Sequence, residues 1–434
     1  MKKPKFQSPT GTHDILPQEQ KYFQKIFDIC KNIANFYGFQ KIDTPIIEEA
    51  ELFSKGVGLT TDIVEKQMYV FRTKGGDWLT LRPEGTASIV RAFIEQGMKN
   101  FPQPVKLWYF GPFFRYEHPQ AGRYRQFHQF GFEVFGERGA VIDSQIIQIF
   151  FNILKELNFK NLICEVNSIG DSQCRPYYKK LLVSYLKYRL DRLCPDCRRR
   201  AKENPLRFFD CKEEKCQRIK LQAPQIIDHL CEECHAHFKE VLEFLDELEI
   251  PYKLNPFLAR GLDYYTRTVF EIFSTGVTKK VEEKENILGN ALVGGGRYDN
   301  LVKVLGGEAI PGIGGAAGIE RIVELMKAKA SKFYQPTPEI FLGQIGGLAK
   351  RKGLKLFEEF RKAKILVAES FGRDSLKAQL RVADKIEAKY TLLLGQKEAL
   401  EGTIIVRDMK TGRQDIIRMD KVVGYMKRKL KSRS

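Results

Sequence analysis

The sequence predicts an α+β protein: an antiparallel sheet flanked by helices, with a helical, cysteine-rich insertion and a C-terminal α/β domain. Strand-like and helical segments are mixed over the first 160 of the 434 residues without a regular β-α-β alternation, which argues against a parallel nucleotide-binding sheet. Six of the nine cysteines fall between Cys194 and Cys234. After residue 339, short apolar runs alternate with helical segments, as in a compact α/β domain.

The first part of the chain contains a long helix and several strands. Apolar residues recur with helical spacing over 18–38, and Gly38 ends this helix. The stretch FQKIDTPIIE predicts a strand interrupted by Pro45, and residues 74–77 form the turn of a predicted hairpin. The stretches KLWYFGPFFRYE and RQFHQFGFEVFG predict two further strands, so antiparallel strands are expected among helices.

Changes in composition divide the chain into four segments. Residues 1–170 and 256–330 are expected to form the two parts of the sheet domain, 171–255 the helical insertion and 331–434 a basic domain. Strand patterns resume at 258–273 and 290–293 after the insertion. The stretches GGGRYDNLVKVLGG and IPGIGGAAGIERIVELM each lead from glycines into a helix, and SKFYQPTPE predicts a linker.

Positive charge is concentrated in the last segment. The chain carries 72 Lys and Arg against 54 Asp and Glu, a net charge of +18, and 331–434 contains 24 basic and 12 acidic residues. This excess predicts a surface for a polyanion, the alternative being a solvated, Lys-rich surface. The N-terminus lacks a signal-peptide apolar run, and no stretch of about 18 apolar residues exists, so we expect a cytoplasmic protein without a membrane span.

Four arginines stand beside glycines and aromatic residues at predicted loop and strand ends: Arg115, Arg123, Arg260 and Arg321. A guanidinium group binds phosphate through two parallel hydrogen bonds and stays charged at any working pH. No Gly-x-x-x-x-Gly-Lys-Ser/Thr loop is present, which excludes a P-loop. The pattern therefore indicates a triphosphate held by side chains, although each arginine alone is more often part of a surface ion pair.

The insertion contains two Cys-x-x-Cys motifs. Cys194 and Cys197 form one, Cys231 and Cys234 form the other, and 33 residues separate them. Two such motifs predict a structural zinc ion held by four thiolates. The alternatives are a different set of four among the six cysteines of this region, or reduced thiols without a metal.

Several stretches together resemble one enzyme family. FRYEHPQAGRYRQFHQFGFEVFG resembles motif 2 of the class II aminoacyl-tRNA synthetases, GIGGAAGIERIV resembles their motif 3, and the helix before IDTPIIEE resembles motif 1. LRPEGT, RGLDYYTRTVFEI and GGGRYDNL are similar to signatures of the histidyl-tRNA synthetases. The resemblance covers nearly the whole chain in order, including the insertion and a C-terminal anticodon-binding domain.

The resemblance implies that histidine is activated by ATP, with Mg²⁺ on the phosphates, and is then transferred to the 3′ end of tRNA(His). It implies ATP contacts for Arg115, Glu117, Arg123, Phe127 and Arg321. Arg260 and Arg115 would be catalytic, because a fixed cation stabilises the charge that grows on the phosphate oxygens as the histidine carboxylate attacks. The alternative for Arg260 is a structural ion pair with Asp263.

The resemblance also implies a histidine pocket, formed by Glu84, Gly85, Thr86, Arg115, Gln129, Glu133, Arg260, Tyr264, Tyr265 and Tyr298. A neutral imidazole has one donor and one acceptor, so a carboxylate and a phenol recognise its two nitrogens. Because side chains alternate along a strand, we expect Tyr264 and Tyr265 to point to opposite sides. The glycines of GGGRYDNL would form a wall of the pocket, the alternative being a plain turn before a helix.

Contacts to tRNA are implied at two places. The motif 2 loop would bring Gln120 and Arg125 to the acceptor end, and Arg373, Lys377 and Arg381 lie at helical spacing in the C-terminal domain. Motif 1 implies a homodimer. Two positions depart from the family pattern. Gly315 replaces a bulky aromatic residue, which would loosen the wall near the nucleotide, and His118 stands where arginine is frequent.

Two other functions fit parts of this pattern. A synthetase-like regulatory subunit of histidine biosynthesis binds histidine without aminoacylation, but such paralogues typically lack the C-terminal domain and have altered arginines. A catalytically inactive tRNA-binding protein would not need the intact set of arginines. Both alternatives are disfavoured by the basic C-terminal segment together with Arg260 and Arg321.

Overall fold

The computed structural model describes residues 5–119, 123–274, 291–328 and 337–431. The chain divides into two compact units, Met1–Ser331 and Lys332–Ser434. No helix in the described ranges combines the length and the apolar composition that crossing a bilayer requires.

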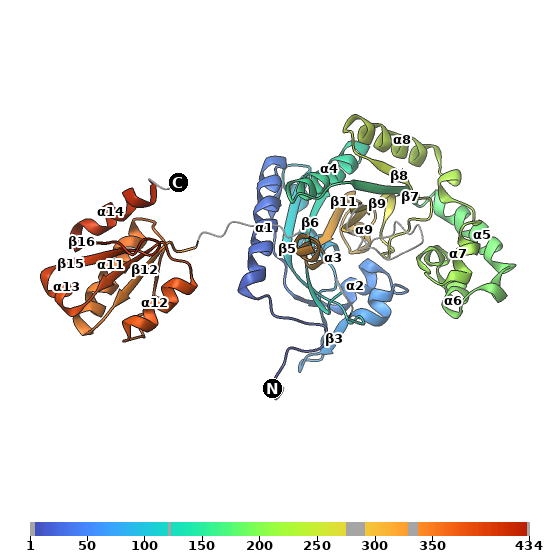
Figure 1. The fold of residues 1–434 in the computed structure, drawn as a ribbon. Helices are drawn as coiled ribbons and strands as arrows, with labels where there is room; N and C mark the ends of the chain where they lie inside the picture. Colours follow the sequence, from blue (N-terminus) through green and yellow to red (C-terminus); the bar gives the residue numbers. More distant parts are fainter. Residues whose placement is uncertain (1–4, 120–122, 275–290, 329–336, 432–434) are drawn as a thin grey trace. The chain divides into compact units, whose positions relative to one another are not determined.

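An eight-stranded sheet lies at the centre of the first unit, in the order β1-β5-β6-β11-β10-β9-β7-β8 (Figure 1). All neighbours from β5 to β7 run antiparallel, and only the edge strands β1 and β8 run parallel to their neighbours. The strands are β1 (Gln40–Lys41), β5 (Val105–Phe114), β6 (Gln126–Phe135), β7 (Leu162–Ser168), β8 (Tyr252–Leu254), β9 (Thr266–Ser274), β10 (Val293–Arg297) and β11 (Gly312–Gly318). The predicted antiparallel sheet is confirmed.

Helices and a small sheet surround this central sheet. The helices are α1 (Pro17–Tyr37), α2 (Ala50–Val57), α3 (Thr86–Glu95), α4 (Ala140–Glu156), α8 (Glu232–Glu247), α9 (Leu301–Val304) and α10 (Ile319–Ala328). The small antiparallel sheet contains β2 (Ile47–Glu49), β3 (Tyr69–Arg72) and β4 (Trp78–Leu81), which includes the predicted hairpin. The first helix ends at Gly38, as predicted, because Gly38 adopts a left-handed conformation (φ 76°).

The two faces of the central sheet have different roles. On one face, Phe150 of α4 packs against Phe130 and Phe132 of β6, with ring centroids 6.0 and 5.6 Å apart. These phenylalanines alternate along β6 with Gly131 and Glu133, which therefore face the other side of the sheet. Helix α4 thus closes one face with an apolar layer and leaves the opposite face for polar side chains.

A buried ion pair ties α4 to strand β10. Arg297, 1% exposed, donates from Nε to Oδ1 of Asp143, which is fully buried, at 3.0 Å. Nε2 of His237 in α8 lies 2.9 Å from the other carboxylate oxygen of Asp143. This network fixes the helical layer relative to the strand that carries the glycine run.

The insertion contains α5 (Cys174–Lys187), α6 (Pro195–Glu203) and α7 (Glu214–Lys220), and 3₁₀ turns connect them. Its core combines Tyr178, Leu182, Leu186 and Phe208 with buried cysteines. Within the predicted insertion 171–255, the last elements instead join the sheet domain: α8 packs on α4, and β8 extends the sheet edge beside β7.

Two details differ from expectation near the glycine-rich segments. Residues 258–265 of the expected strand 258–273 are not strand, and β9 begins only at Thr266. Residues 294–296 lie inside β10, so the glycine run is a strand rather than a turn before a helix. Only glycine fits there, because Phe270 of β9 and the backbone of β11 lie directly against Gly295.

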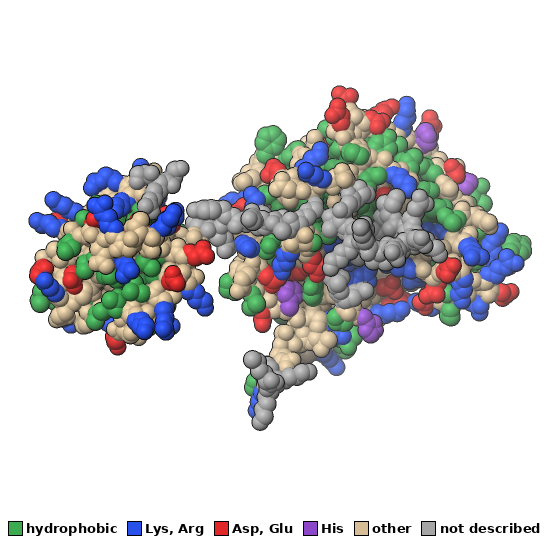
Figure 2. Space-filling view, in the orientation of Figure 1, with side chains coloured by type: hydrophobic (Ala, Val, Ile, Leu, Met, Phe, Trp, Pro, Cys, Tyr) green, Lys and Arg blue, Asp and Glu red, His purple; other side chains and the backbone are tan. Residues whose placement is uncertain are grey.

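The second unit is a five-stranded sheet in the order β13-β12-β14-β15-β16 with helices around it. Its strands are β12 (Ile340–Gln344), β13 (Val367–Glu369), β14 (Tyr390–Leu394), β15 (Thr403–Asp408) and β16 (Gln414–Arg418). Its helices are α11 (Gly347–Lys362), α12 (Leu376–Lys385), α13 (Gln396–Glu401) and α14 (Met419–Lys431). The predicted α/β pattern is confirmed, and Figure 2 shows lysine and arginine side chains at several places on its visible face.

Candidate active site

Glycines on the polar face of the central sheet make room for charged side chains. In the strand register Gly314 of β11 pairs with Glu133 of β6, and Gly294 of β10 pairs with Glu271 of β9. A Cβ atom on Gly314 would collide with the carboxylate of Glu133, and one on Gly294 would collide with the guanidinium group of Arg260. The absence of side chains therefore lets Glu133 and Arg260 lie directly against the sheet backbone.

Glu133 is the most deeply buried carboxyl of this face. Its side chain accepts hydrogen bonds from the Thr86 hydroxyl, at 2.8 Å, and from the Tyr298 hydroxyl. Burial raises the pKa of Glu133 to about 8, although both hydrogen bonds act to lower it. Glu133 therefore exchanges a proton near neutral pH, which suits a group that binds an ionisable ligand.

Glu84 lies beside Glu133 at the start of helix α3. Its two carboxylate oxygens accept the backbone N–H groups of Thr86 and Ala87 at 2.8 and 2.7 Å, and the Tyr264 hydroxyl lies 3.3 Å from one of them. Burial raises the pKa of Glu84, and these hydrogen bonds oppose the shift. Gly85 has no space for a side chain, because a Cβ there would stand 2.6 Å from the Tyr109 ring.

Three tyrosines line the same region. The rings of Tyr264 and Tyr265 lie 4.7 Å apart, and the rings of Tyr264 and Tyr298 lie 5.7 Å apart. Burial raises the pKa of Tyr264 and of Tyr298 well above the ordinary value, so both hydroxyls remain donors. The expectation that Tyr264 and Tyr265 point to opposite sides is wrong. Strand alternation does not apply to them, because both residues precede β9.

Arg260 reaches this face from the segment that precedes β9. Its Nη1 atom forms an ion pair with Glu271, and its guanidinium carbon lies 5.9 Å from the centre of the Tyr265 ring. The alternative pairing with Asp263 is wrong, because Asp263 instead pairs with Arg207 at 3.4 Å. Glu271 raises the pKa of Arg260 against the effect of burial. The cation is therefore permanent and is held at a fixed place on the sheet.

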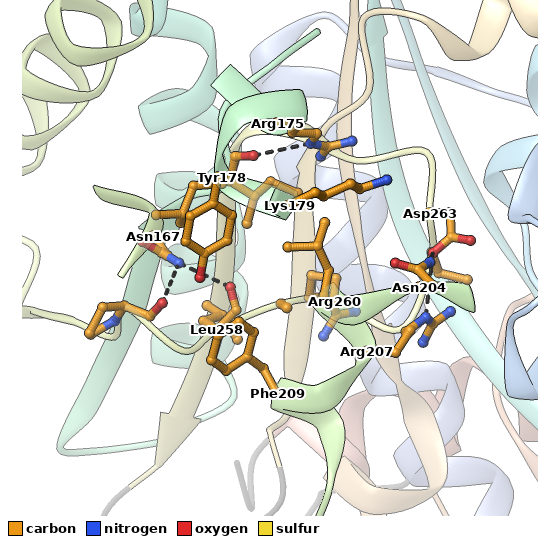
Figure 3. A pocket seen from close by; sticks show the side chains of 16 residues that line it. Asn167, Arg175, Tyr178, Lys179, Asn204, Arg207, Phe209, Leu258, Arg260 and Asp263 are labelled. Atoms are coloured by element: carbon orange, nitrogen blue, oxygen red, sulfur yellow. Dashed lines mark hydrogen bonds and ion pairs between the residues drawn. The ribbon is translucent and has the colours of Figure 1, made fainter. Parts of the chain in front are cut away.

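The insertion meets the Arg260 segment around a cavity of about 140 Å³ (Figure 3). Asn167 holds this segment by donating to the carbonyl oxygens of Pro256 and Leu258 at 3.3 and 3.1 Å. Asn204 donates to Asp263 at 3.2 Å from the insertion side. These contacts from both sides position the loop that carries Arg260.

Arg115 follows strand β5 and lies near Glu84. Its Nε atom donates to the carbonyl oxygen of Pro83 at 2.8 Å, and its guanidinium carbon lies 5.3 Å from the centre of the Phe127 ring. Burial lowers the pKa of Arg115, whereas the carboxylates of Glu117 and Glu84 raise it. The Nε hydrogen bond fixes the group, and among the described residues the two amino groups have no hydrogen-bond acceptor, so they can bind an anion.

Arg123 and Arg321 form a second cationic region with Glu117. Nη1 of Arg321, in α10, donates to the carbonyl oxygen of Ala291 at 2.6 Å. Burial and then the charge of Arg123 lower the pKa of Arg321. Arg123 lies 3.7 Å from the carboxylate of Glu117. Two neighbouring cations with one carboxylate leave positive charge for phosphate oxygens.

The structure thus brings the predicted residues into two adjoining regions. Glu84, Gly85, Thr86, Glu133 and the three tyrosines form a polar cluster where the histidine pocket is expected, and Gln129, on strand β6 with Glu133, is half-buried. The arginines Arg115, Arg123, Arg260 and Arg321 are the expected cations around it. Such an arrangement can hold a small zwitterion with a ring beside a polyphosphate.

Sequence reasoning placed Gly294 in the pocket wall but missed Glu271, Tyr109 and Gly314. A signal for the glycines exists: the runs GGG and GIGG place glycine at every second position of a strand, which clears one face of the sheet. Glu271 has no such signal, because its pairing with Arg260 depends on the fold of the segment between them.

The two departures from the family pattern lie in different environments. Gly315 faces away from the pocket, and a Cβ there would stand 2.9 Å from Phe150 of α4 and 3.1 Å from Phe270. The expected loosening of the wall is therefore wrong, since Phe150 and Phe270 fill the space beside Gly315. His118 is exposed in the loop between β5 and β6.

The residues predicted to contact tRNA differ in how they are placed. Gln120 lies outside the described residues. Arg125 is partly held within its own loop: its Nε donates to the Glu117 carbonyl at 3.2 Å, and its guanidinium carbon lies 4.0 Å from the centre of the Tyr116 ring. Lys377 and Arg381 are exposed on α12, whereas Arg373 is exposed just before that helix.

The predicted set of four metal ligands is not brought together. Cys194 and Cys197 instead lie with Cys211 and Cys216, and all four sulfur atoms are within 4.8 Å of one another. Cys231 and Cys234 belong to a second group with Asp171 and Cys174, which has the same limit on its ligand-atom distances. The two Cys-x-x-Cys motifs start different helices, α6 and α8, and each group is completed by side chains from other segments of the chain.

Comparison with known proteins agrees with this arrangement. The model of the family "Histidyl-tRNA synthetase" matches residues 11–170 and 212–322, and the model "Anticodon binding domain" matches residues 345–429. A histidine–tRNA ligase of Caldicellulosiruptor saccharolyticus is 42% identical over 98% of this chain and 100% of its own length. A histidine–tRNA ligase of Dehalococcoides mccartyi is 43% identical with the same coverage.

A solved structure supports the fold over the same extent. The crystal structure of apo S. aureus histidyl-tRNA synthetase is 34% identical, with a TM-score of 0.80, and the alignment covers 97% of this chain and 99% of that one. Family models, relatives and structure agree over the catalytic and C-terminal units, so the chain belongs to the histidyl-tRNA synthetase family.

Proposed function

We propose that the protein is a histidine–tRNA ligase that joins histidine to AMP with release of diphosphate and then transfers the histidyl group to the 3′ end of tRNA(His). One observation carries this proposal. A buried set of carboxyl and phenol groups lies near Arg260, whose guanidinium group lies against the backbone of Gly294. The carboxyl and phenol groups fit an imidazole and an ammonium group, and the Arg260 guanidinium group fits a reacting phosphate. Relatives that bear the ligase name match this chain over nearly its whole length, including the C-terminal unit, so the regulatory-subunit alternative is disfavoured.

Histidine would be recognised by paired hydrogen bonds in the polar pocket. Glu133 is held by Thr86 and Tyr298 and accepts a further donor such as an imidazole N–H. Glu84, close to the Tyr264 hydroxyl, offers negative charge to the α-ammonium group. A side chain that cannot form these bonds leaves buried polar groups unpaired, and such sites reject it by about 10⁴-fold or more.

ATP would lie against the arginines. Arg115 would contact the α-phosphate and the histidine carboxylate, and Arg123 and Arg321 would hold the terminal phosphates, with adenine between Phe127 and Glu117. Arg260 would stabilise the charge on the α-phosphate oxygens as the carboxylate attacks, without any reorganisation of the site. Carboxylate oxygens of Glu117 and Glu271 lie among these cations and fit the ligand preference of Mg²⁺, which supplies further charge neutralisation when bound with ATP.

Transfer requires that tRNA contact both the catalytic unit and the C-terminal unit. We place the anticodon on the C-terminal unit, where the exposed Lys377 and Arg381 supply positive charge, and the acceptor end at the loop that carries Arg125. We also expect a homodimer through the motif 1 region, and a cytoplasmic location where tRNA is charged. A structural zinc ion at Cys194, Cys197, Cys211 and Cys216 would complete the insertion core, because four thiolates fill a tetrahedral site.

Amino-acid-dependent exchange of diphosphate into ATP tests the activation step. The wild-type protein should support exchange with histidine alone among the twenty amino acids. Arg260→Ala should lower the exchange rate by about 10²–10³-fold, the usual effect of losing one preorganised charge-stabilising group. Arg361→Ala is the matched control, because Arg361 is exposed on α11 of the second unit and pairs with Glu358 of the same helix. A folded wild-type protein that exchanges with no amino acid, or with another one, would contradict the proposal.

A further inference from the structure

The second group of metal-ligand side chains lies at the junction of the insertion and the sheet. Asp171 follows strand β7, Cys174 begins α5, and Cys231 and Cys234 lie at the start of α8. One oxygen of Asp171 and the three sulfur atoms all lie within 4.8 Å of one another, and Cys174 and Cys234 are buried. We propose that these four side chains bind a second zinc-type ion, separate from the four-cysteine group.

The donor set and its spacing fit a tetrahedral metal. Three thiolates and one carboxylate are ligands that Zn²⁺ accepts, and a Zn–S bond of about 2.3 Å places tetrahedral ligand atoms about 3.8 Å apart. That separation lies within the limit observed for this group. The four-cysteine group shows this same ligand separation, since its Cys194 and Cys211 sulfur atoms are 3.8 Å apart.

The backbone around the second group is shaped for its ligands. The N–H of Cys231 donates to the sulfur of Cys174 at 3.1 Å, as backbone amides do toward metal-bound thiolates. Gly170 has a left-handed conformation (φ 60°), and a Cβ there would stand 2.7 Å from Cβ of Cys174. Arg267 lies 3.4 Å from both Asp171 and Glu233, so a cation offsets the negative charge of the donor set.

This site is connected to the histidine pocket through a short path. Arg175, the residue after Cys174, donates from Nε to the Ile169 carbonyl at 3.1 Å (Figure 3). Its Nη2 donates to the carbonyl oxygen of Tyr265. The backbone of Arg267 is also hydrogen-bonded to Gly170 and Ile169 at 2.8 Å. An ion that fixes Cys174 and Asp171 therefore fixes the segment that carries Tyr264 and Tyr265. This consequence, unlike the metal site itself, rests on the proposed function.

The family model leaves out residues 171–211, the stretch that supplies Asp171 and Cys174. The proposed ion would be held partly by residues that this match does not cover. The ion would link the insertion to the catalytic unit through its ligand bonds.

Metal analysis of the full-length protein, purified without chelator and supplied with Zn²⁺, tests the site. We expect two ions per chain in the wild type, one in Cys174→Ser and one in Cys197→Ser. Cys30→Ser is the control and should keep both ions, because Cys30 is a buried cysteine of α1 outside both groups. One ion per chain in the wild type together with no loss in Cys174→Ser would overturn the proposal.

A second measurement needs no variant. Alkylation followed by peptide mass spectrometry should show Cys174, Cys231 and Cys234 protected with Zn²⁺ and reactive after chelation. Unchanged reactivity, or a disulfide between Cys231 and Cys234 in freshly purified protein, would overturn the proposal. Histidine binding measured by calorimetry then tests the link to Tyr265: Cys174→Ser should weaken it several-fold, whereas Cys197→Ser should not. The metal count does not depend on aminoacylation, so failure of one proposal is distinguishable from failure of the other.

Discussion

The guanidinium group of Arg260 lies against the backbone of Gly294 and forms an ion pair with Glu271, the residue that faces Gly294 in the neighbouring strand. The paired strands β9 and β10 thus supply both the backbone on which this cation lies and the carboxylate that holds it, and the cation is the one proposed to act in catalysis. The cation is held in place before any ligand arrives, which is the condition under which a charged group lowers a reaction barrier.

Gly294→Ala should displace this guanidinium group. We expect histidine-dependent diphosphate exchange to fall at least about tenfold, because a displacement of about 1 Å is enough to disturb a catalytic group. Gly424→Ala is the matched control, since a Cβ at Gly424 in α14 meets no atom within 4 Å. Equal exchange rates for Gly294→Ala and wild type would show that Arg260 does not depend on the glycine.

Glu133→Gln should change how stability depends on pH. The pKa of about 8 for folded Glu133 exceeds the unfolded value of about 4.3, so the folded state retains the proton over this range. The free energy of unfolding of the wild type therefore falls as pH rises through this window, by up to about 1.4 kcal/mol per pH unit. Glutamine stays neutral, so the variant should lack this part of the decline. Thermal or urea unfolding at several pH values checks this. The prediction would be contradicted if the free energies of unfolding of the wild type and the variant changed in parallel with pH.

Asp143→Asn should destabilise the catalytic unit by about 3 kcal/mol, because it removes the buried counter-charge of Arg297 and leaves, among the described residues, only the half-buried Asp299, 3.1 Å from its Nη1, to pair with it. Burial alone would raise the pKa of Asp143, but Arg297 and His237 hold it below the ordinary value. The contribution of ionised Asp143 to the free energy of unfolding is therefore present at neutral pH and is lost only as pH falls through that lowered pKa. Glu51→Gln, which breaks an exposed pair with Lys55, should cost less than about 1 kcal/mol in the same denaturant titration.

Arg381→Ala should weaken tRNA binding without changing which tRNA is preferred. A phosphate contact contributes through release of counterions, so the slope of log affinity against log salt should decrease by about 1. Lys397→Ala on α13 is the control, because Lys397 is also exposed in the same unit. Binding measured at several salt concentrations distinguishes the two, and an unchanged slope for Arg381→Ala would remove this residue from the interface.

Chelation should lower the unfolding temperature of the protein if zinc completes the insertion core. The four cysteines of the first group lie within the buried cluster that includes Phe208, so losing the ion leaves like-charged or protonated thiols inside it. Calorimetry with and without chelator, followed by re-addition of Zn²⁺, measures the effect. A transition that is insensitive to chelation would exclude a stabilising ion.

The sequence by itself determined the elements and the chemistry of the site. Periodicity marked the first helix, the hairpin, and strands β5 and β6, because these patterns arise from neighbours in the chain. The resemblance to the family's motifs pointed to Glu84, Glu133, the tyrosines and the arginines, which are recognised in the sequence itself. The basic C-terminal segment likewise needed only composition.

The tertiary structure decided which side chains meet. The Cys-x-x-Cys motifs separate into two groups because α6 and α8 begin in different parts of the fold. Arg260 pairs with Glu271 rather than with nearby Asp263, since Asn204 and Arg207 of the insertion hold Asp263. Each of these partnerships joins segments far apart in sequence or depends on a loop without periodicity. No local pattern encodes them, because they arise only when the sheet and the insertion pack together.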